Sequence, residues 1–134
     1  MSTPDPIPTA QPSQSAAAAP EGLGHLQRRF LPLLAKLIDF AYSQGYELAA
    51  GELYRTPEQA ALNAHNGIGI RSSLHTLRLA ADLMLFKDGV YLRDWSAYQP
   101  LGEYWEKLDP LAAWGGRFQS RDGDHFSLTF GGVK

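Results

Sequence analysis

The segment SLHTLRLAADLMLF, residues 73–86, predicts the central strand of this protein. From Leu79 to Phe86 it is an almost continuous apolar run that is interrupted by one acid, Asp82. A short run without polar alternation is typical of a strand that is buried on both faces of a sheet. A carboxylate in such a strand is costly unless it is paired or bound to a metal. Asp82 therefore needs a partner elsewhere in the chain.

The segments next to this run predict two further strands. Residues 87–89, Lys-Asp-Gly, are a hairpin turn signal, and residues 90–92 form the return strand. Before the run, residues 46–54 read as a short strand that Gly51 interrupts. Together these segments indicate a small, mostly antiparallel sheet.

Three segments predict helices that back this sheet. Leucine and phenylalanine recur at three- and four-residue spacing over residues 22–45, and Pro32 either kinks this helix or marks its true start. Residues 56–59, Thr-Pro-Glu-Gln, are a capping box that opens a short helix ending near residues 66–67. Apolar residues at helical spacing over residues 101–108 suggest the third helix.

The predicted fold is a single α+β domain over residues 22–134, with a metal bound on one face of the sheet. Residues 1–21 are rich in proline, alanine and serine and carry almost no large apolar side chain. Such a segment cannot repay the entropy of ordering, so we interpret it as a disordered tail. A docking peptide is the alternative interpretation.

Composition excludes several classes of protein. The chain has no cysteine, which excludes disulfides, cysteine-ligated zinc and thiol catalysis. A formal net charge of -2 gives no basic footprint for nucleic acid. No apolar run approaches the roughly 20 residues of a transmembrane helix, and no basic and apolar N-terminal regions indicate a Sec signal. Any transition metal must therefore be bound by histidine and carboxylate side chains.

Two histidines and Asp82 form a candidate metal site. His75 precedes Asp82 in a loop that can fold back onto the strand, and His125 opens a last strand, residues 125–130, where alternation points it away from the apolar face. Each has a structural alternative, since Asp82 can accept backbone N–H groups or pair with an arginine and a lone histidine is usually structural. Together they offer the three N/O ligands of a catalytic zinc site with an open position. His65, near a helix end, is either a fourth polar group or a surface residue.

Charged residues near these ligands predict the catalytic groups. Asp122 lies in a glycine-containing turn, from which its carboxylate can act as a general base without being a ligand. Asp124 is the competing acid, but it points to the opposite side if the last strand has already begun. Arg55 is well placed for a cation that stabilises an oxyanion. A salt bridge to Glu52 or Glu58 is the alternative role for this arginine.

A two-part motif combines these residues in a fixed order. Its residues are Ser73-x-His75-x6-Asp82 and Asp122-x-x-His125, accompanied by residues 54–59, Ala80 and Trp-Gly-Gly at 114–116. The motif resembles the zinc signature of the M15 peptidases over roughly residues 40–128. That family comprises D-alanyl-D-alanine carboxypeptidases and dipeptidases, and phage endolysins that cut L-alanyl-D-glutamate bonds.

The resemblance implies the fold, the cofactor and the reaction. The fold is Hedgehog/DD-peptidase-like, and one Zn²⁺ is bound by His75, Asp82 and His125, with Asp122 as catalytic acid/base and Arg55 near the scissile carbonyl. The expected reaction is hydrolysis of a peptide bond in the peptidoglycan stem peptide by a phage-type L-Ala-D-Glu endopeptidase. The alternatives are a D-alanyl-D-alanine carboxypeptidase and, in a different class, a non-catalytic wall-binding or structural phage protein. Two histidines and a carboxylate also suit non-haem iron, but Asp122 then has no obvious role.

Two positions depart from the family pattern. Arg78 stands where the family often has glycine, and since arginine takes positive φ only at a cost, the backbone there is either ordinary or strained. Arg117 stands where the family often has an acidic residue. Neither position is a ligand, so these departures concern substrate preference more than hydrolysis.

The same reasoning gives expectations about partners and location. We expect a monomer whose substrate is the stem peptide, without a nucleic-acid partner and without insertion into a membrane. Made without a signal peptide, the protein would act on the cell wall in the periplasm after release, or would be carried on a phage particle.

Overall fold

The computed structural model describes residues 22–67 and 73–134, so the tail expected at residues 1–21 lies outside the described residues. The α-helices are α1 (Leu23–Ser43), α2 (Pro57–His65) and α3 (Gln99–Leu108). Short 3₁₀ helices are η2 (Leu74–Leu77), η3 (Trp95–Tyr98) and η4 (Gly115–Arg117). The strands are β1 (Glu47–Ala50), β2 (Ala80–Lys87), β3 (Val90–Leu92), β4 (Ala112–Trp114) and β5 (His125–Leu128).

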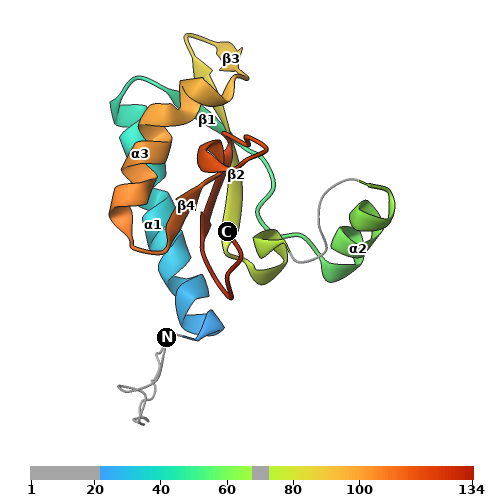
Figure 1. The fold of residues 1–134 in the computed structure, drawn as a ribbon. Helices are drawn as coiled ribbons and strands as arrows, with labels where there is room; N and C mark the ends of the chain where they lie inside the picture. Colours follow the sequence, from blue (N-terminus) through green and yellow to red (C-terminus); the bar gives the residue numbers. More distant parts are fainter. Residues whose placement is uncertain (1–21, 68–72) are drawn as a thin grey trace, which may run out of the picture.

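The strands form one antiparallel sheet around β2. Their order is β1-β2-β5-β4, and β3 pairs with β2 through the hairpin. The register places Asp82 of β2 directly opposite His125 of β5. Figure 1 shows α1 and α3 next to each other beside the sheet, whereas α2 lies apart from it. The predicted α+β class with a mostly antiparallel sheet is therefore confirmed.

The core lies between the sheet and the two helices α1 and α3. Trp105 of α3 is fully buried, and its indole N–H donates to the backbone carbonyls of Ala113 and Ser127 at 3.1 Å each. The rings of Phe30 and Phe126 meet this indole edge-on, with centroids 5.8 and 6.1 Å away. Since the polar N–H is satisfied, the large ring can fill the core without a desolvation penalty.

The helices begin and end close to their predicted positions, with two differences. α1 continues through Pro32, so this proline does not mark the start of the helix. The hydroxyl of Thr56 caps α2 by accepting from the N–H of Gln59 at 3.0 Å. The side chain of Gln59 donates to Asn63 instead of reaching back, so only half of the predicted capping box forms. None of the helices in the described residues is both long and apolar enough to cross a membrane.

The hairpin after β2 forms as predicted. It turns through Asp88 and Gly89, whose φ angles of 52° and 79° are those of a type I′ turn.

The segment after β1 places its backbone against Asp82. Regular pairing of β1 with β2 ends at Ala50, earlier than predicted. The N–H of Gly51 then donates to the carbonyl of Asp82 at 2.8 Å. A Cβ at position 51 would lie 2.9 Å from that oxygen, so a glycine is needed for this close approach.

Candidate metal centre

A short 3₁₀ helix aims His75 at the central strand. Ser73 caps η2, and its hydroxyl accepts from the N–H of His75 at 3.1 Å. The Nδ1 atom of His75 lies 2.9 Å from the carbonyl oxygen of Leu53. A carbonyl only accepts, so Nδ1 carries the proton in the neutral ring and Nε2 carries a lone pair. That Nε2 atom lies 3.3 Å from Oδ1 of Asp82.

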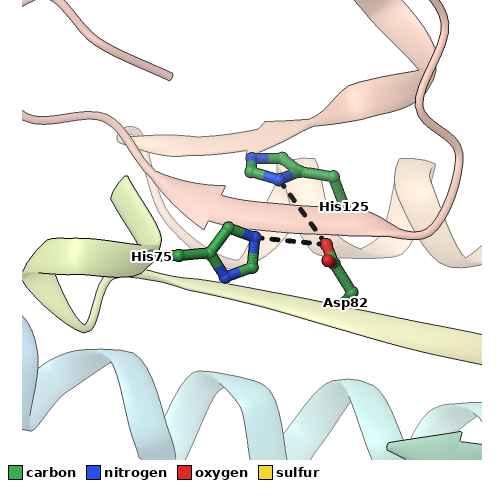
Figure 2. Close-up of side chains that lie close together, drawn as sticks. All are labelled: His75, Asp82 and His125. Atoms are coloured by element: carbon green, nitrogen blue, oxygen red, sulfur yellow. Dashed lines mark ion pairs between the residues drawn. The ribbon is translucent and has the colours of Figure 1, made fainter. Parts of the chain in front are cut away.

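The second imidazole approaches the same carboxylate oxygen from β5. Strand alternation puts Phe126 and Leu128 in the core and His125 on the other face, as predicted. The Nδ1 atom of His125 lies 3.8 Å from Oδ1 of Asp82. Its Nε2 atom lies 3.0 Å from the hydroxyl of Ser127, which is fully buried. Figure 2 shows both rings directed at Asp82.

The oxygen between the two rings has no donor. Oδ1 of Asp82 is buried and accepts no hydrogen bond in the structure. The ligand atoms of His75, Asp82 and His125 all lie within 4.8 Å of one another. Ligands about 2.0–2.1 Å from a zinc ion at tetrahedral angles lie roughly 3.4 Å apart, close to the two distances from Asp82. Lone pairs of two nitrogens and one oxygen that face one another repel without a donor between them. The arrangement therefore suits a metal ion that accepts all three.

Burial keeps one of the rings neutral. Burial lowers the pKa of His125 to about 4, and the attraction of Asp82 only partly opposes this. Burial also disfavours the charged form of His75, but its contacts with Asp82 and with the Leu53 carbonyl outweigh that effect and raise its pKa. A neutral His125 has the protonation state that a metal ligand needs.

Two acids from the turn before β5 lie beside the candidate ligands. Carboxylate oxygens of Asp82, Asp122 and Asp124 lie within 4.8 Å of one another, so Asp122 lies beside the candidate ligands and its role as acid/base stays a prediction. Asp122 is exposed and Asp124 is half-buried. Asp124 was expected to point to the opposite side only if the last strand had already begun there. Because β5 begins at His125, this condition is not met, and strand alternation does not apply to Asp124. Burial and the carboxylate of Asp122 raise the pKa of Asp124 to about 7.

Arg55 lies near the candidate ligands in a pair with Glu52. Its guanidinium donates to both carboxylate oxygens of Glu52, and this hydrogen bond lowers the pKa of Glu52. Its backbone N–H donates to the carbonyl of His75 at 3.2 Å, which ties the segment to η2. The predicted salt bridge to Glu52 is therefore confirmed, and a role at the scissile carbonyl stays a prediction.

The three other residues singled out from the sequence lie outside the ligand cluster. Arg78 has a φ of 59°, so the strained alternative is confirmed, and its guanidinium lies 3.9 Å from the centre of the Tyr54 ring. Arg117 is exposed and pairs with Glu106 at 3.0 Å. His65 is an exposed residue at the end of α2, away from the sheet (Figure 1).

The groups that orient the two rings were not predicted. Ser127 had a signal in the sequence, because it lies two residues after His125 and so shares its strand face. The carbonyl of Leu53 had none, because any residue can offer a backbone oxygen. Such outer partners fix the tautomer and orientation of histidine ligands.

Replacing Ser127 by alanine is expected to weaken the binding of Zn²⁺ by roughly ten- to a hundredfold, because the ring of His125 loses the group that orients it. Titration calorimetry with ZnCl₂ measures this affinity. Replacing Ser96, which lies outside the ligand cluster, by alanine is the matched control. An unchanged affinity in the Ser127 variant would show that this hydroxyl does not support the ligand.

Two solved structures share this fold, although a scan against protein-family models and a search of the curated proteins found no match. One is the L-Ala D-Glu endopeptidase ChiX of Serratia marcescens, at 23% identity and a TM-score of 0.62 over 80% of this chain and 86% of that one. The other is a mutant of the vancomycin resistance D,D-pentapeptidase VanY from a VanB-type cassette, in complex with Zn(II). It matches at 20% identity and a TM-score of 0.51, over 75% of this chain and 70% of that one. The expected DD-peptidase-like fold is thus confirmed.

Proposed function

We propose that this protein is a zinc metallopeptidase that hydrolyses a peptide bond in the peptidoglycan stem peptide. The observation that carries the proposal is the buried Oδ1 of Asp82, which lies between two imidazole nitrogens and accepts no hydrogen bond. His75, Asp82 and His125 would hold one Zn²⁺. The fold shared with an L-Ala D-Glu endopeptidase and a Zn(II)-containing D,D-pentapeptidase supports this choice of metal and substrate.

The residues around the ligands suit peptide hydrolysis. When bound, Zn²⁺ supplies Lewis-acid chemistry, which lowers the pKa of a water to roughly 7 and polarises a carbonyl. Asp122 accepts the proton of the attacking water, and later gives a proton to the leaving amine. Its exposed carboxylate lies close enough to Asp82 to reach both groups. The guanidinium of Arg55, which Glu52 holds in place, stabilises negative charge on the carbonyl oxygen.

The bond that we propose is L-Ala-D-Glu, cut by an endopeptidase of the phage endolysin type. The longer shared region with ChiX favours this assignment. A D-alanyl-D-alanine carboxypeptidase is the alternative that the similarity to VanY favours. Either activity requires access to the cell wall, so we also propose that the protein acts there, after release from the cell or from a phage particle.

Purified murein incubated with the protein is expected to release peptides with a new amino terminus at D-Glu. Adding a chelator is expected to abolish this release, and adding back Zn²⁺ is expected to restore it, because the ligand cluster holds the ion that supplies the Lewis acid. Mass spectrometry of the soluble products identifies the bond. Loss of terminal D-Ala alone would replace the endopeptidase by the carboxypeptidase assignment.

A protein of another class would give a different result in the same assay. A non-catalytic wall-binding protein would sediment with murein but release nothing, whatever the metal content. Elemental analysis of the purified protein separates zinc from iron, the other metal that two histidines and a carboxylate suit.

A further inference from the structure

A polar pocket of about 330 Å³ adjoins the metal centre. Asp122 and Asp124 line it, and these are the same acids whose carboxylates lie within 4.8 Å of Asp82. Its volume is in the range of pockets that hold small ligands. The carboxylate proposed as acid/base is therefore part of the pocket wall, and a group of the substrate next to the cleaved bond can occupy the pocket.

Two guanidinium groups line this pocket, and neither forms an ion pair with the three aspartates that also line it. The guanidinium of Arg121 lies 3.8 Å from the centre of the Trp95 ring, and one of its nitrogens donates to the carbonyl of Gly116 at 3.1 Å. The guanidinium of Arg93 lies 5.6 Å from the centre of the Tyr91 ring. An arginine stacked on an aromatic face, as Arg121 is, keeps its in-plane N–H groups available, and these fit a carboxylate in a two-pronged geometry.

The platform under Arg121 is built into the fold. Trp95 begins η3, which the carboxylate of Asp94 caps by accepting from the N–H of Ser96 at 3.2 Å. The carbonyl of Gly123, in the turn before β5, accepts from the indole of Trp114 at 2.7 Å. A Cβ at Gly123 would lie 2.7 Å from the backbone of Trp95, so the turn packs directly on the platform. The wall of the pocket under Arg121 is thus preformed, which lowers the cost of binding a charged group there.

The position of Asp122 tells which part of the substrate the pocket receives. An acid/base that returns a proton to the leaving amine must lie against the residue that carries this amine. Since Asp122 lines the pocket, the pocket lies on the side of the leaving residue. In the stem peptide the chain continues from the γ-carboxyl of D-Glu, so the α-carboxylate of this leaving residue is free. A terminal D-Ala also leaves with a free carboxylate.

We propose that this pocket is a specificity site for a free carboxylate on the leaving residue, which Arg93 and Arg121 bind. The inference rests on the proposed function and adds the chemical group of the substrate that the enzyme recognises, the free carboxylate. It explains how cleavage can be restricted to a residue with a free carboxylate. In an ordinary peptide that carboxyl is tied up in the next peptide bond.

The test compares synthetic stem peptides that differ in one group, the free carboxylate or its carboxamide on the leaving residue. One pair presents the L-Ala-D-Glu bond and the other presents a terminal D-Ala. Wild-type protein loaded with Zn²⁺ is expected to hydrolyse the carboxylate form with a kcat/KM roughly ten- to a hundredfold higher, the size of one charge-assisted interaction. In R121Q and R93Q this preference is expected to fall toward one, through loss on the carboxylate form only.

The matched control is R117Q. Arg117 also lies over a tryptophan ring, 5.3 Å from the centre of Trp114, but it does not line this pocket and pairs with Glu106. Its variant is expected to keep the wild-type preference. A wild type that cuts both forms equally, or arginine variants that keep the preference, would overturn the carboxylate site and leave the proposed function standing. A wild type that cuts neither pair would overturn the proposed function and the site with it.

Discussion

Replacing Asp82 by asparagine is expected to abolish the binding of Zn²⁺ while the fold remains intact. The carboxylate oxygen Oδ1 faces Nε2 of His75 at 3.3 Å and Nδ1 of His125 at 3.8 Å. An amide has nearly the same shape, but it carries no charge to neutralise the cation. We expect the affinity for Zn²⁺ to fall by roughly a hundredfold or more, at least the cost of losing an outer partner of a ligand.

The variant also separates a metal site from a structural ion pair. Without a metal, and at a pH high enough that His75 is neutral, Oδ1 of Asp82 is buried and has no hydrogen-bond donor, so the wild type gains little from this charge. The metal-free variant is therefore expected to melt at the same temperature as the metal-free wild type or above it. If Asp82 instead served mainly to pair with a charged histidine, its replacement would lower the melting temperature.

Thermal unfolding with and without ZnCl₂ measures both effects. At a free concentration one hundred times the dissociation constant, the ion stabilises the wild type by about 2.7 kcal/mol. This gain is expected to fall to about 0.4 kcal/mol or less in Asp82→Asn and to stay unchanged in Asp88→Asn. Asp88 is a suitable control because it lies in the hairpin turn at a φ of 52°, which asparagine tolerates. An equal zinc-dependent shift in Asp82→Asn would show that this carboxylate is not a ligand.

Two of the three candidate ligands, Asp82 and His125, were predictable because each breaks a pattern of its surroundings. Asp82 is an acid within an apolar run, and it forms part of β2 as expected. His125 precedes alternating core residues, so the strand period alone placed it on the opposite face. The sequence did not show that Asp82 and His125 lie directly opposite each other. This pairing is known only from the register of β2 and β5 in the structure.

One orientation and several short elements could not be predicted. The orientation of Asp124 depended on whether the last strand had already begun there, and β5 begins at His125, as predicted, which leaves Asp124 in the turn. Strand β4, residues Ala112–Trp114, is only three residues long and shows no period. The 3₁₀ helix η2 follows from the hydroxyl of Ser73, a local contact that competes with the predicted loop. Local capping and short pairings of this kind depend on tertiary contacts.

The conformation of Arg78 could not be predicted from this residue alone, because it depends on a contact with another side chain. The cost of its positive φ, 59°, is about 1 kcal/mol or more for a residue other than glycine. Its guanidinium lies over the ring of Tyr54 at 3.9 Å, and a contact of this kind at an exposed site contributes about 0.5–1 kcal/mol. The two terms are similar in size. A cation at a position that favours glycine is thus tolerable once its aromatic partner is known.

Replacing Asp122 by asparagine is expected to lower kcat by roughly a hundred- to ten-thousandfold, the usual contribution of a general acid/base. Asparagine cannot accept the proton of the attacking water or return one to the leaving amine. The carboxylate of Asp122 is exposed, and Asp122 is not one of the three candidate ligands, which are His75, Asp82 and His125. The affinity for Zn²⁺ is therefore expected to stay within a fewfold of the wild type, in contrast to Asp82→Asn.

The neighbouring acid provides the decisive control for this assignment. Asp124 offers a carboxylate within 4.8 Å of Asp122, but it is half-buried, and burial raises its pKa to about 7. At about one pH unit above this pKa Asp124 is mostly ionised. At that pH Asp124→Asn removes nearly the same charge from the same turn, so it reproduces any general electrostatic effect on the metal. We expect this variant to keep at least tenfold more activity on murein peptides than Asp122→Asn at equal zinc content. The reverse order would assign the proton transfer to Asp124, because the variant that stops turnover while it retains the metal identifies the acid that moves the proton.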